Sequence, residues 1–284
     1  MTVQLFAGEW HAEVRPEIGG VLSALRFNGV DVLRPMPADA TDPLQSASFA
    51  LVPYCNRIAD GTFRWCEQMI EMPRNFPPEQ HSLHGLGWQV PWEVARADSF
   101  RCTLVHRHSG SDASWPWAYR AEQRIRLGAQ GCKVTLDVTN FADTPMPTGL
   151  GFHPYFRRNP ETRLRFASEG MMVVDAGLIP TGERVPSKTL ADWGAGTALP
   201  EVLVDHCFVH WAGKVRIEDA LGTITLSARG APNLHVYSPT DDSALCCEPV
   251  THTPDAPNQS PGEMIVLPPG CTASVEMEIS AMAA

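Results

Sequence analysis

Proline and glycine are spread so densely through this sequence that few windows could support a helix of several turns. The chain of 284 residues holds 25 prolines and 22 glycines. Proline removes a backbone donor and clashes with the preceding helical turn, and no segment sustains a 3.6-residue apolar period across three or four turns. This distribution favours a mainly antiparallel β architecture.

Short segments of alternating polar and apolar residues indicate strands along much of the chain. Residues 21–34 place apolar side chains on both sides of Asn28-Gly29, a dipeptide that readily adopts the positive φ angles of a tight turn, so a hairpin is predicted there. The same alternation predicts strands at residues 124–127, 133–139, 215–217, 223–226 and 273–279. Residues 180–200 are polar and rich in glycine, and we expect them to form a long surface loop.

Length and composition are those of one folded unit. Hydrophobic residues make up 44% of the chain and charged residues 19%, which is sufficient apolar material for a full core. No internal repeat, charge block or low-complexity linker divides the sequence, so residues 1–284 are expected to form a single domain.

The acidic balance argues against partners that are themselves anionic. The formal net charge is −10, so nucleic acid and an anionic membrane surface would be repelled. The first residues lack the basic start and apolar stretch of a signal peptide, and no later segment approaches the ~20 apolar residues of a membrane span. We therefore expect a cytoplasmic protein whose eight cysteines, which form no CxxC pair, are reduced and mostly buried.

Side chains able to do chemistry are concentrated in stretches that should form loops or strand ends, where a β scaffold carries function. His153 stands between Phe152 and Pro154. A residue before proline is held extended, which suits a positioned acid or base, although a histidine packed among aromatic neighbours explains the pattern equally well. His84 precedes Gly85, which permits close approach of a ligand or an unusual structural turn.

A glutamate and an arginine also lie in apolar surroundings. Glu248 follows Leu245-Cys246-Cys247, where loss of hydration would raise the pKa of its carboxyl towards that of a useful general base; the alternative is a glutamate that faces solvent. Arg57, next to Asn56, either pairs with a buried carboxylate or offers its guanidinium to a ligand oxygen.

Metal and phosphate chemistry find little support in the sequence. His106 and His108 would share one strand face, but no third ligand stands at a characteristic spacing, so no metal site is predicted. There is no Gly-rich phosphate loop and no Gly-x-Ser-x-Gly elbow. Several aromatic residues, Tyr237 among them, offer the flat surfaces that sugars use, although most of the tryptophans are expected in the core.

Taken together, these stretches resemble the aldose 1-epimerase (galactose mutarotase) family, in the same order and over nearly the whole chain. The resemblance rests on five separate motifs: Asn56-Arg57-Ile58 with Gly61, Leu83-His84-Gly85, His153 in His-Pro-Tyr-Phe, Asp205 in Asp-His-Cys-Phe, and Glu248 with downstream Asn258-Gln259. It implies an all-β fold, a large antiparallel β-sandwich of the galactose mutarotase-like supersandwich type, with a cleft on one face and no cofactor.

The resemblance also implies roles for individual residues. Glu248 would be the catalytic base and His153 the acid, with His84 assisting them at the sugar oxygens. Substrate binding is assigned to four further residues: Arg57, Asp205, Asn56 and Tyr237. These assignments predict a mutarotase that interconverts the α and β anomers of a free aldohexose or related monosaccharide, acting as a monomer or homodimer.

Two alternatives stay open at this point. Arg157 and Arg158, directly after the His153 motif, could meet a 6-phosphate or 6-sulfonate sugar, although neighbouring residues of an extended segment point to opposite faces, so at most one of the two arginines would face the cleft. The other alternative is a carbohydrate-binding protein of the same fold without turnover. The presence of both Glu248 and His153 argues against it, because binding alone needs no acid and base pair.

Overall fold

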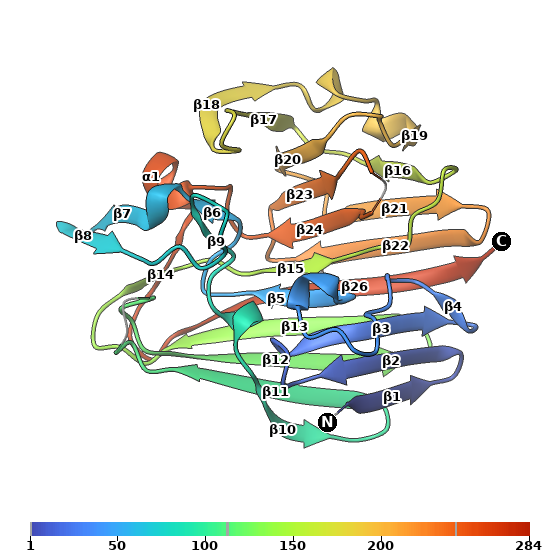
Figure 1. The fold of residues 1–284 in the computed structure, drawn as a ribbon, viewed down its shortest axis with the longest axis horizontal. Coiled ribbons are helices and arrows are strands. Elements are labelled where there is room, and N and C mark those ends of the chain that lie inside the picture. The colour runs from blue at the N-terminus through green and yellow to red at the C-terminus, as the bar shows by residue number, and fades with distance from the viewer. Residues whose placement is uncertain (1, 112–113, 242) are drawn as a thin grey trace.

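Two large antiparallel sheets stack as layers in the structure (Figure 1), a computed structural model that describes residues 2–111, 114–241 and 243–284. The first sheet runs in the order β1-β2-β3-β5-β15-β24-β23-β20-β17-β18, with β4 paired to β3. Its strands are Val3–Ala7 (β1), Trp10–Arg15 (β2), Val21–Phe27 (β3), Val30–Asp31 (β4), Ser48–Leu51 (β5), Gly151–Pro154 (β15), Gly170–Val174 (β17), Pro180–Val185 (β18), Val204–Val209 (β20), Asn233–Ser238 (β23) and Cys246–Val250 (β24).

The second sheet runs in the order β10-β11-β12-β13-β26-β22-β21-β16-β19. Its strands are Glu93–Ala97 (β10), Arg101–His108 (β11), Tyr119–Gly128 (β12), Gly131–Asn140 (β13), Arg163–Phe166 (β16), Thr197–Ala198 (β19), Lys214–Asp219 (β21), Gly222–Arg229 (β22) and Thr272–Ala283 (β26).

Smaller elements lie outside these sheets. Three short pairs join Arg57–Ile58 (β6) to Ser82–Leu83 (β9), Thr62–Trp65 (β7) to Gln68–Glu71 (β8), and Met146–Thr148 (β14) to Ile265–Leu267 (β25). Within the described residues the helical elements are Ala256–Gln259 (α1) and the 3-10 turns Pro43–Gln45 (η1), Ala59–Gly61 (η2), Gly87–Gln89 (η3), Ser187–Thr189 (η4), Trp193–Ala195 (η5) and Pro261–Glu263 (η6).

The strand predictions are confirmed, and one loop prediction is wrong. Strands β3 and β4 form the predicted hairpin, with Asn28 and Gly29 at positive φ, and each of the five other predicted segments lies inside a longer strand. Residues 180–200, expected to be a surface loop, instead contain β18 and β19. Trp193 in this segment is buried and stacks on Phe166 at 5.4 Å, because its large apolar ring outweighs the polar character of the residues around it.

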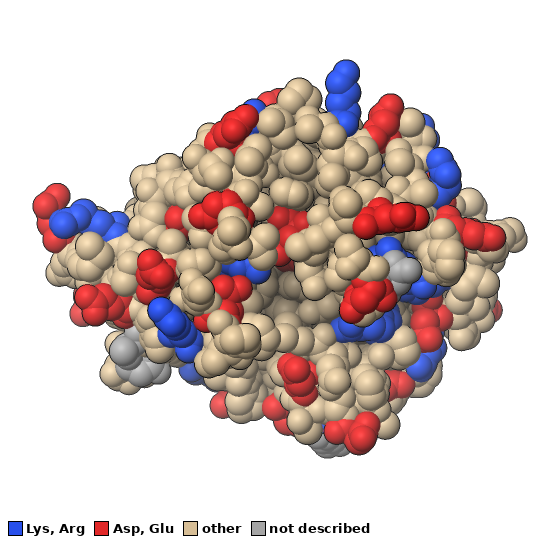
Figure 2. All heavy atoms as spheres, turned by 45° about the horizontal axis from the view of Figure 1, so that its top comes forward, with Lys and Arg blue, Asp and Glu red and all other residues tan. Residues whose placement is uncertain are grey.

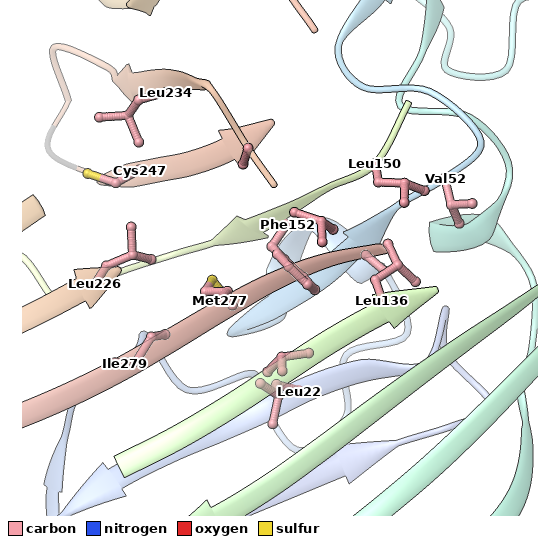
Figure 3. Close-up of a cluster of buried hydrophobic side chains, with 14 of the residues drawn as sticks. Leu22, Val52, Leu136, Leu150, Phe152, Leu226, Leu234, Cys247, Met277 and Ile279 are labelled. Carbon is pink, nitrogen blue, oxygen red and sulfur yellow. The ribbon is translucent and has the colours of Figure 1, made fainter. Parts of the chain in front are cut away.

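The main core lies between the two sheets, and the pleat decides which side chains enter it. Phe152, Leu234 and Cys247 of the first sheet meet side chains of the second sheet there, as Figure 3 shows. Successive residues of a strand point to opposite faces. The residues that follow these three along β15, β23 and β24 therefore point to the other face of the first sheet.

The expectations about the cysteines and about membrane-spanning segments can be compared with the structure. All eight cysteines are free thiols and six of them are buried, as predicted. No helix in the described parts of the chain is long and apolar enough to cross a membrane.

Candidate active site

Four neighbouring strands place ionisable side chains on the face of the first sheet that points away from the main core. Glu248 on β24 lies directly opposite His235 on β23, and Tyr237 on the same strand lies opposite Asp205 on β20. His153 on β15 extends this row of side chains. One face of the molecule is hollowed near its middle, and acidic and basic side chains gather at the hollow (Figure 2).

The loops carrying Asn56 and His84 cover the row, and each loop uses an unusual backbone conformation. Asn56 and His84 both have left-handed φ angles, 56° and 58°. The Asn56 N–H donates to Nδ1 of His84 at 3.1 Å, and the His84 N–H donates to the Asn56 carbonyl oxygen at 2.9 Å. Gly85, with φ 69°, completes the turn, because a β carbon there would lie 2.3 Å from the carbonyl oxygen of Val52.

The segment that follows Glu248 fixes the loop of Asn56 and Arg57. His252 accepts a hydrogen bond from the Cys55 N–H at 3.0 Å. The Asp255 N–H donates to the Arg57 carbonyl at 2.8 Å, and its carboxylate accepts from the Ala59 N–H at 2.9 Å. The loop of Asn56 and Arg57 and the chain that follows Glu248 are therefore held together, although almost two hundred residues separate them in the sequence.

Glu248 and His153 converge in the most enclosed part of the site. The side chains are only 2% and 8% exposed, and Nε2 of His153 lies 3.3 Å from Oε1 of Glu248. Phe49 and Tyr155 stack on the His153 ring, each with its centroid 4.7 Å away, and fix its plane. Within the described residues, Nδ1 of His153 and Oε2 of Glu248 are buried and have no hydrogen-bond partner, so each has an unused position for a hydrogen bond.

Burial moves both members of this pair towards their neutral forms. It raises the pKa of Glu248 to about 8, with the positive charges of His235 and Arg57 opposing the rise and the Asp205 carboxylate adding to it. It also lowers the pKa of His153 to about 3, helped by the charge of His235. Around neutrality burial therefore favours a protonated Glu248 next to a neutral His153, so the two groups carry one ionisable proton between them.

His84 has one fixed tautomer. Because Nδ1 accepts from the Asn56 N–H, the ring proton must be on Nε2. Burial, followed by the charges of His153 and Arg57, lowers the pKa of His84 well below its usual range. His84 is therefore a neutral imidazole that can donate a hydrogen bond from Nε2, and its ring lies 5.2 Å from that of His153.

Arg57 and Asp205 belong to a connected polar cluster. The Arg57 guanidinium donates from Nε to Glu79 at 3.0 Å and reaches Oδ2 of Asp205 at 3.5 Å. His235 donates from Nε2 to Oδ1 of Asp205 at 2.6 Å, and Asn56 accepts from the Arg57 N–H. Of the two interpretations that the sequence leaves open for Arg57, the pairing with a buried carboxylate is present, and the Arg57 side chain is 11% exposed.

All seven residues singled out from the sequence thus lie in one site, but sequence reasoning missed two of its members. His235 is two residues before Tyr237, so the period-two alternation of this strand places both on one face and could have identified it. Glu79 carries no local signal, because it reaches Arg57 from a loop outside every strand.

Comparison with known proteins assigns the family. The sequence model of aldose 1-epimerase matches residues 7–280. The chain belongs to the aldose 1-epimerase family. It is similar to the uncharacterized protein YphB of Escherichia coli K12, with 30% identity over 277 residues that cover 92% of each chain. It is also similar to the uncharacterized protein YihR of the same organism, with 26% identity over 73% of this chain and 68% of that one.

Solved structures bear out the fold expected of this family. A protein of Escherichia coli K12, provisionally described as an aldose 1-epimerase, superimposes with a TM-score of 0.92 over 100% of this chain and 99% of the other, at 27% identity. A galactose mutarotase-like protein from Clostridium acetobutylicum gives a TM-score of 0.88 over 99% and 95% of the two chains, at 20% identity. The predicted large antiparallel β-sandwich is confirmed.

One set of donor atoms in the site could meet a metal ion. His84, His153 and Glu248 each place one ligand atom within 4.8 Å of the others, and two imidazoles with a carboxylate are a donor set that divalent transition metals accept. The same three residues have an acid/base role in the family resemblance, which involves no metal.

We predict that metal removal leaves any aldose 1-epimerase activity of this protein unchanged, because the buried acid and base are supplied by side chains alone. The measurement is anomer exchange before and after treatment with a strong chelator and desalting. Activity that is lost on this treatment and restored by a single divalent ion would show that His84, His153 and Glu248 are metal ligands.

Proposed function

We propose that this protein interconverts the α and β anomers of a neutral aldohexose or related monosaccharide by general acid/base catalysis. The observation that carries the proposal is the 3.3 Å approach of Oε1 of Glu248 to Nε2 of His153 in an enclosed site. Anomer exchange requires proton transfers at two oxygens of one carbon, the anomeric hydroxyl and the ring oxygen. An acid and a base that serve them must therefore converge on one point, as these two side chains do.

Each half-reaction conserves the one proton of the pair. The step starts from the ionised form of the pair, in which the proton has moved from Glu248 to His153. Glu248 takes the proton of the anomeric hydroxyl while His153 gives its proton to the ring oxygen, so the ring carbon–oxygen bond breaks and an aldehyde forms. After this step Glu248 is protonated and His153 neutral, the forms that burial favours. Rotation about the bond next to the aldehyde carbon, followed by the reverse transfers, closes the ring as the other anomer.

The remaining residues position the sugar. His84 donates from Nε2 to a sugar oxygen and stabilises the negative charge that develops there. Arg57 and Asp205 offer a donor and an acceptor to ring hydroxyls, and Asn56 and Tyr237 line the same side. A sugar with several hydroxyl groups can satisfy such a set of alternating donors and acceptors.

The charges around the site favour a neutral substrate over an anionic one. Arg57 is already paired with Asp205 and Glu79. Arg157 is occupied by Asp219, to which it donates two hydrogen bonds at 2.9 and 3.0 Å. Arg158 donates to the Ser238 hydroxyl at 2.8 Å and to nearby carbonyl oxygens. These contacts pair Arg57 and Arg157 with carboxylates and occupy donors of Arg158 that a phosphate or sulfonate would need.

Replacing Glu248 by glutamine should reduce turnover ~100-fold or more while sugar binding persists, because the amide keeps the shape but cannot accept the proton. The measurement is anomer exchange by NMR with the spontaneous rate subtracted, together with calorimetric sugar binding. Glu161→Gln, the same change at an exposed position, is the matched control. A folded Glu248→Gln protein with near wild-type exchange would exclude Glu248 as the base. A wild-type protein that binds sugar but does not accelerate anomer exchange would favour the carbohydrate-binding alternative.

Activity should depend on pH as expected for a pair that shares one proton. Below the lower pKa of the pair both groups are protonated and no base remains, and above about pH 8 the pair has lost the proton that the acid must give. We therefore expect kcat/KM to be level through neutrality and to fall roughly tenfold per pH unit on the alkaline side. A rate above the spontaneous background that keeps rising between pH 8 and 10 would contradict the shared proton.

Neutral sugars should be turned over faster than their 6-phosphate or 6-sulfonate counterparts. A panel of glucose, galactose and the corresponding anionic sugars, followed by NMR, measures the preference. Arg158→Ala should leave that preference in place, because Arg158 already donates to Ser238 and to backbone carbonyls. Faster turnover of an anionic sugar, with the advantage lost in Arg158→Ala, would establish the anionic substrate class instead.

A further inference from the structure

His235 is a buried histidine whose imidazole has an unusually close acidic partner. It is 3% exposed, in the middle of β23 between Leu234 and Val236, and its Nε2 lies 2.6 Å from Oδ1 of Asp205. The side chain of Asp205 is itself 7% exposed and is held on its other oxygen by Arg57. A contact this short between a buried imidazole and a carboxylate is the geometry of a charge-assisted hydrogen bond.

The strand register places this imidazole next to the candidate base. His235 and Glu248 are direct partners across β23 and β24, so their side chains leave the same face of the sheet a few ångströms apart. The Asn56 amide nitrogen lies 3.4 Å from both ring nitrogens, so it rests against the ring rather than on one nitrogen. The ionisable groups that surround His235 are Asp205 and Cys207 on β20, Glu248 on β24, His153 on β15, and Arg57 and His84 on the covering loops.

Among the described residues, the other positive charge that lowers the pKa of Glu248 is that of Arg57, which is already paired with carboxylates. Oε2 of Glu248 has no hydrogen-bond partner in the part of the chain that the structure describes, and Arg57 is shared between Asp205 and Glu79. Burial lowers the pKa of His235, but the Asp205 hydrogen bond and the charges of Glu248 and Asp205 outweigh it and raise that pKa overall. The positive charge of His235 is in turn the largest influence that opposes the raised pKa of Glu248.

Resting on the function proposed above, we propose that His235 is a positioning residue: Asp205 holds a proton on its imidazole, and the resulting charge, directly across the strands from Glu248, lets that buried carboxyl ionise and act as the base. Asp205 then has two tasks, to bind the sugar and to keep His235 charged. The proposal also explains why a sheet face that carries the catalytic glutamate contains a second buried acid, since the acid and the imidazole neutralise each other.

The test is the pH profile of His235→Gln, which removes the charge but keeps a polar side chain that can donate to Asp205. Loss of a positive charge near Glu248 should move both limbs of the kcat/KM profile to higher pH by about one unit or more, and lower kcat at neutral pH at least about tenfold. His206→Gln is the matched control, because His206 lies on the opposite face of β20 and bonds the Met172 carbonyl. Its profile should match wild type.

A structural role for His235 would give a different result. His235→Gln would then lower the melting temperature or the rate without moving either limb, and this outcome would overturn the proposal. NMR of the ring nitrogens in the wild-type protein supplies a test that needs no variant and no activity. We expect an imidazolium at pH 7 that becomes neutral in Asp205→Asn.

The two proposals fail in distinguishable ways. A neutral His235 ring in wild type at pH 7 overturns the positioning role, whatever the activity. A wild-type protein that accelerates anomer exchange of no sugar overturns the proposed function and with it the catalytic meaning of His235, even where the imidazolium is observed.

Discussion

The chemistry proposed for this site depends on one carboxyl group, that of Glu248, which is buried on the face of a sheet. Burial alone would keep this group protonated and the neighbouring His153 neutral. The two side chains lie 3.3 Å apart in this enclosed setting, and in the proposed mechanism one proton serves both. A carboxylate exposed to water would ionise more easily but would be a weaker base, and burial therefore sets both the strength of the base and its need for a compensating charge.

Strand alternation separates the chemistry from the core that supports it. Phe152, Leu234 and Cys247 pack between the sheets, while the next residue on each strand, His153, His235 and Glu248, faces the site. Neighbouring residues of a strand share one backbone, and packing in the core holds that backbone rigid. The core therefore fixes the positions of the polar side chains on the opposite face. Precise placement of an acid and a base follows from packing on the opposite face.

The covering loops are fixed in another way, by hydrogen bonds rather than by a sheet. Asn56 and His84 hold each other in left-handed conformations, and His252 and Asp255 tie the Asn56 loop to the chain after β24. Such conformations persist only where surrounding contacts stabilise them. The result is a donor with a fixed tautomer at His84 and a guanidinium at Arg57 directed by two carboxylates.

The sequence by itself determined the all-β class, the hairpins and the family, because period-two alternation, turn residues and short motifs are local properties of the chain. It also singled out Glu248, His153, His84 and Arg57 as candidate site residues, because each stands in such a motif. Only the tertiary structure decided how these groups lie relative to one another. Nε2 of His153 is 3.3 Å from Oε1 of Glu248, Arg57 contacts both Glu79 and Asp205, and His235 bonds Asp205 while lying opposite Glu248. The tertiary structure also showed that Trp193, in a segment whose composition indicated a loop, is buried against Phe166. The physical reason is that pKa values, ion pairs and burial depend on distances between residues far apart in sequence, and those distances are fixed only when the sheets pack.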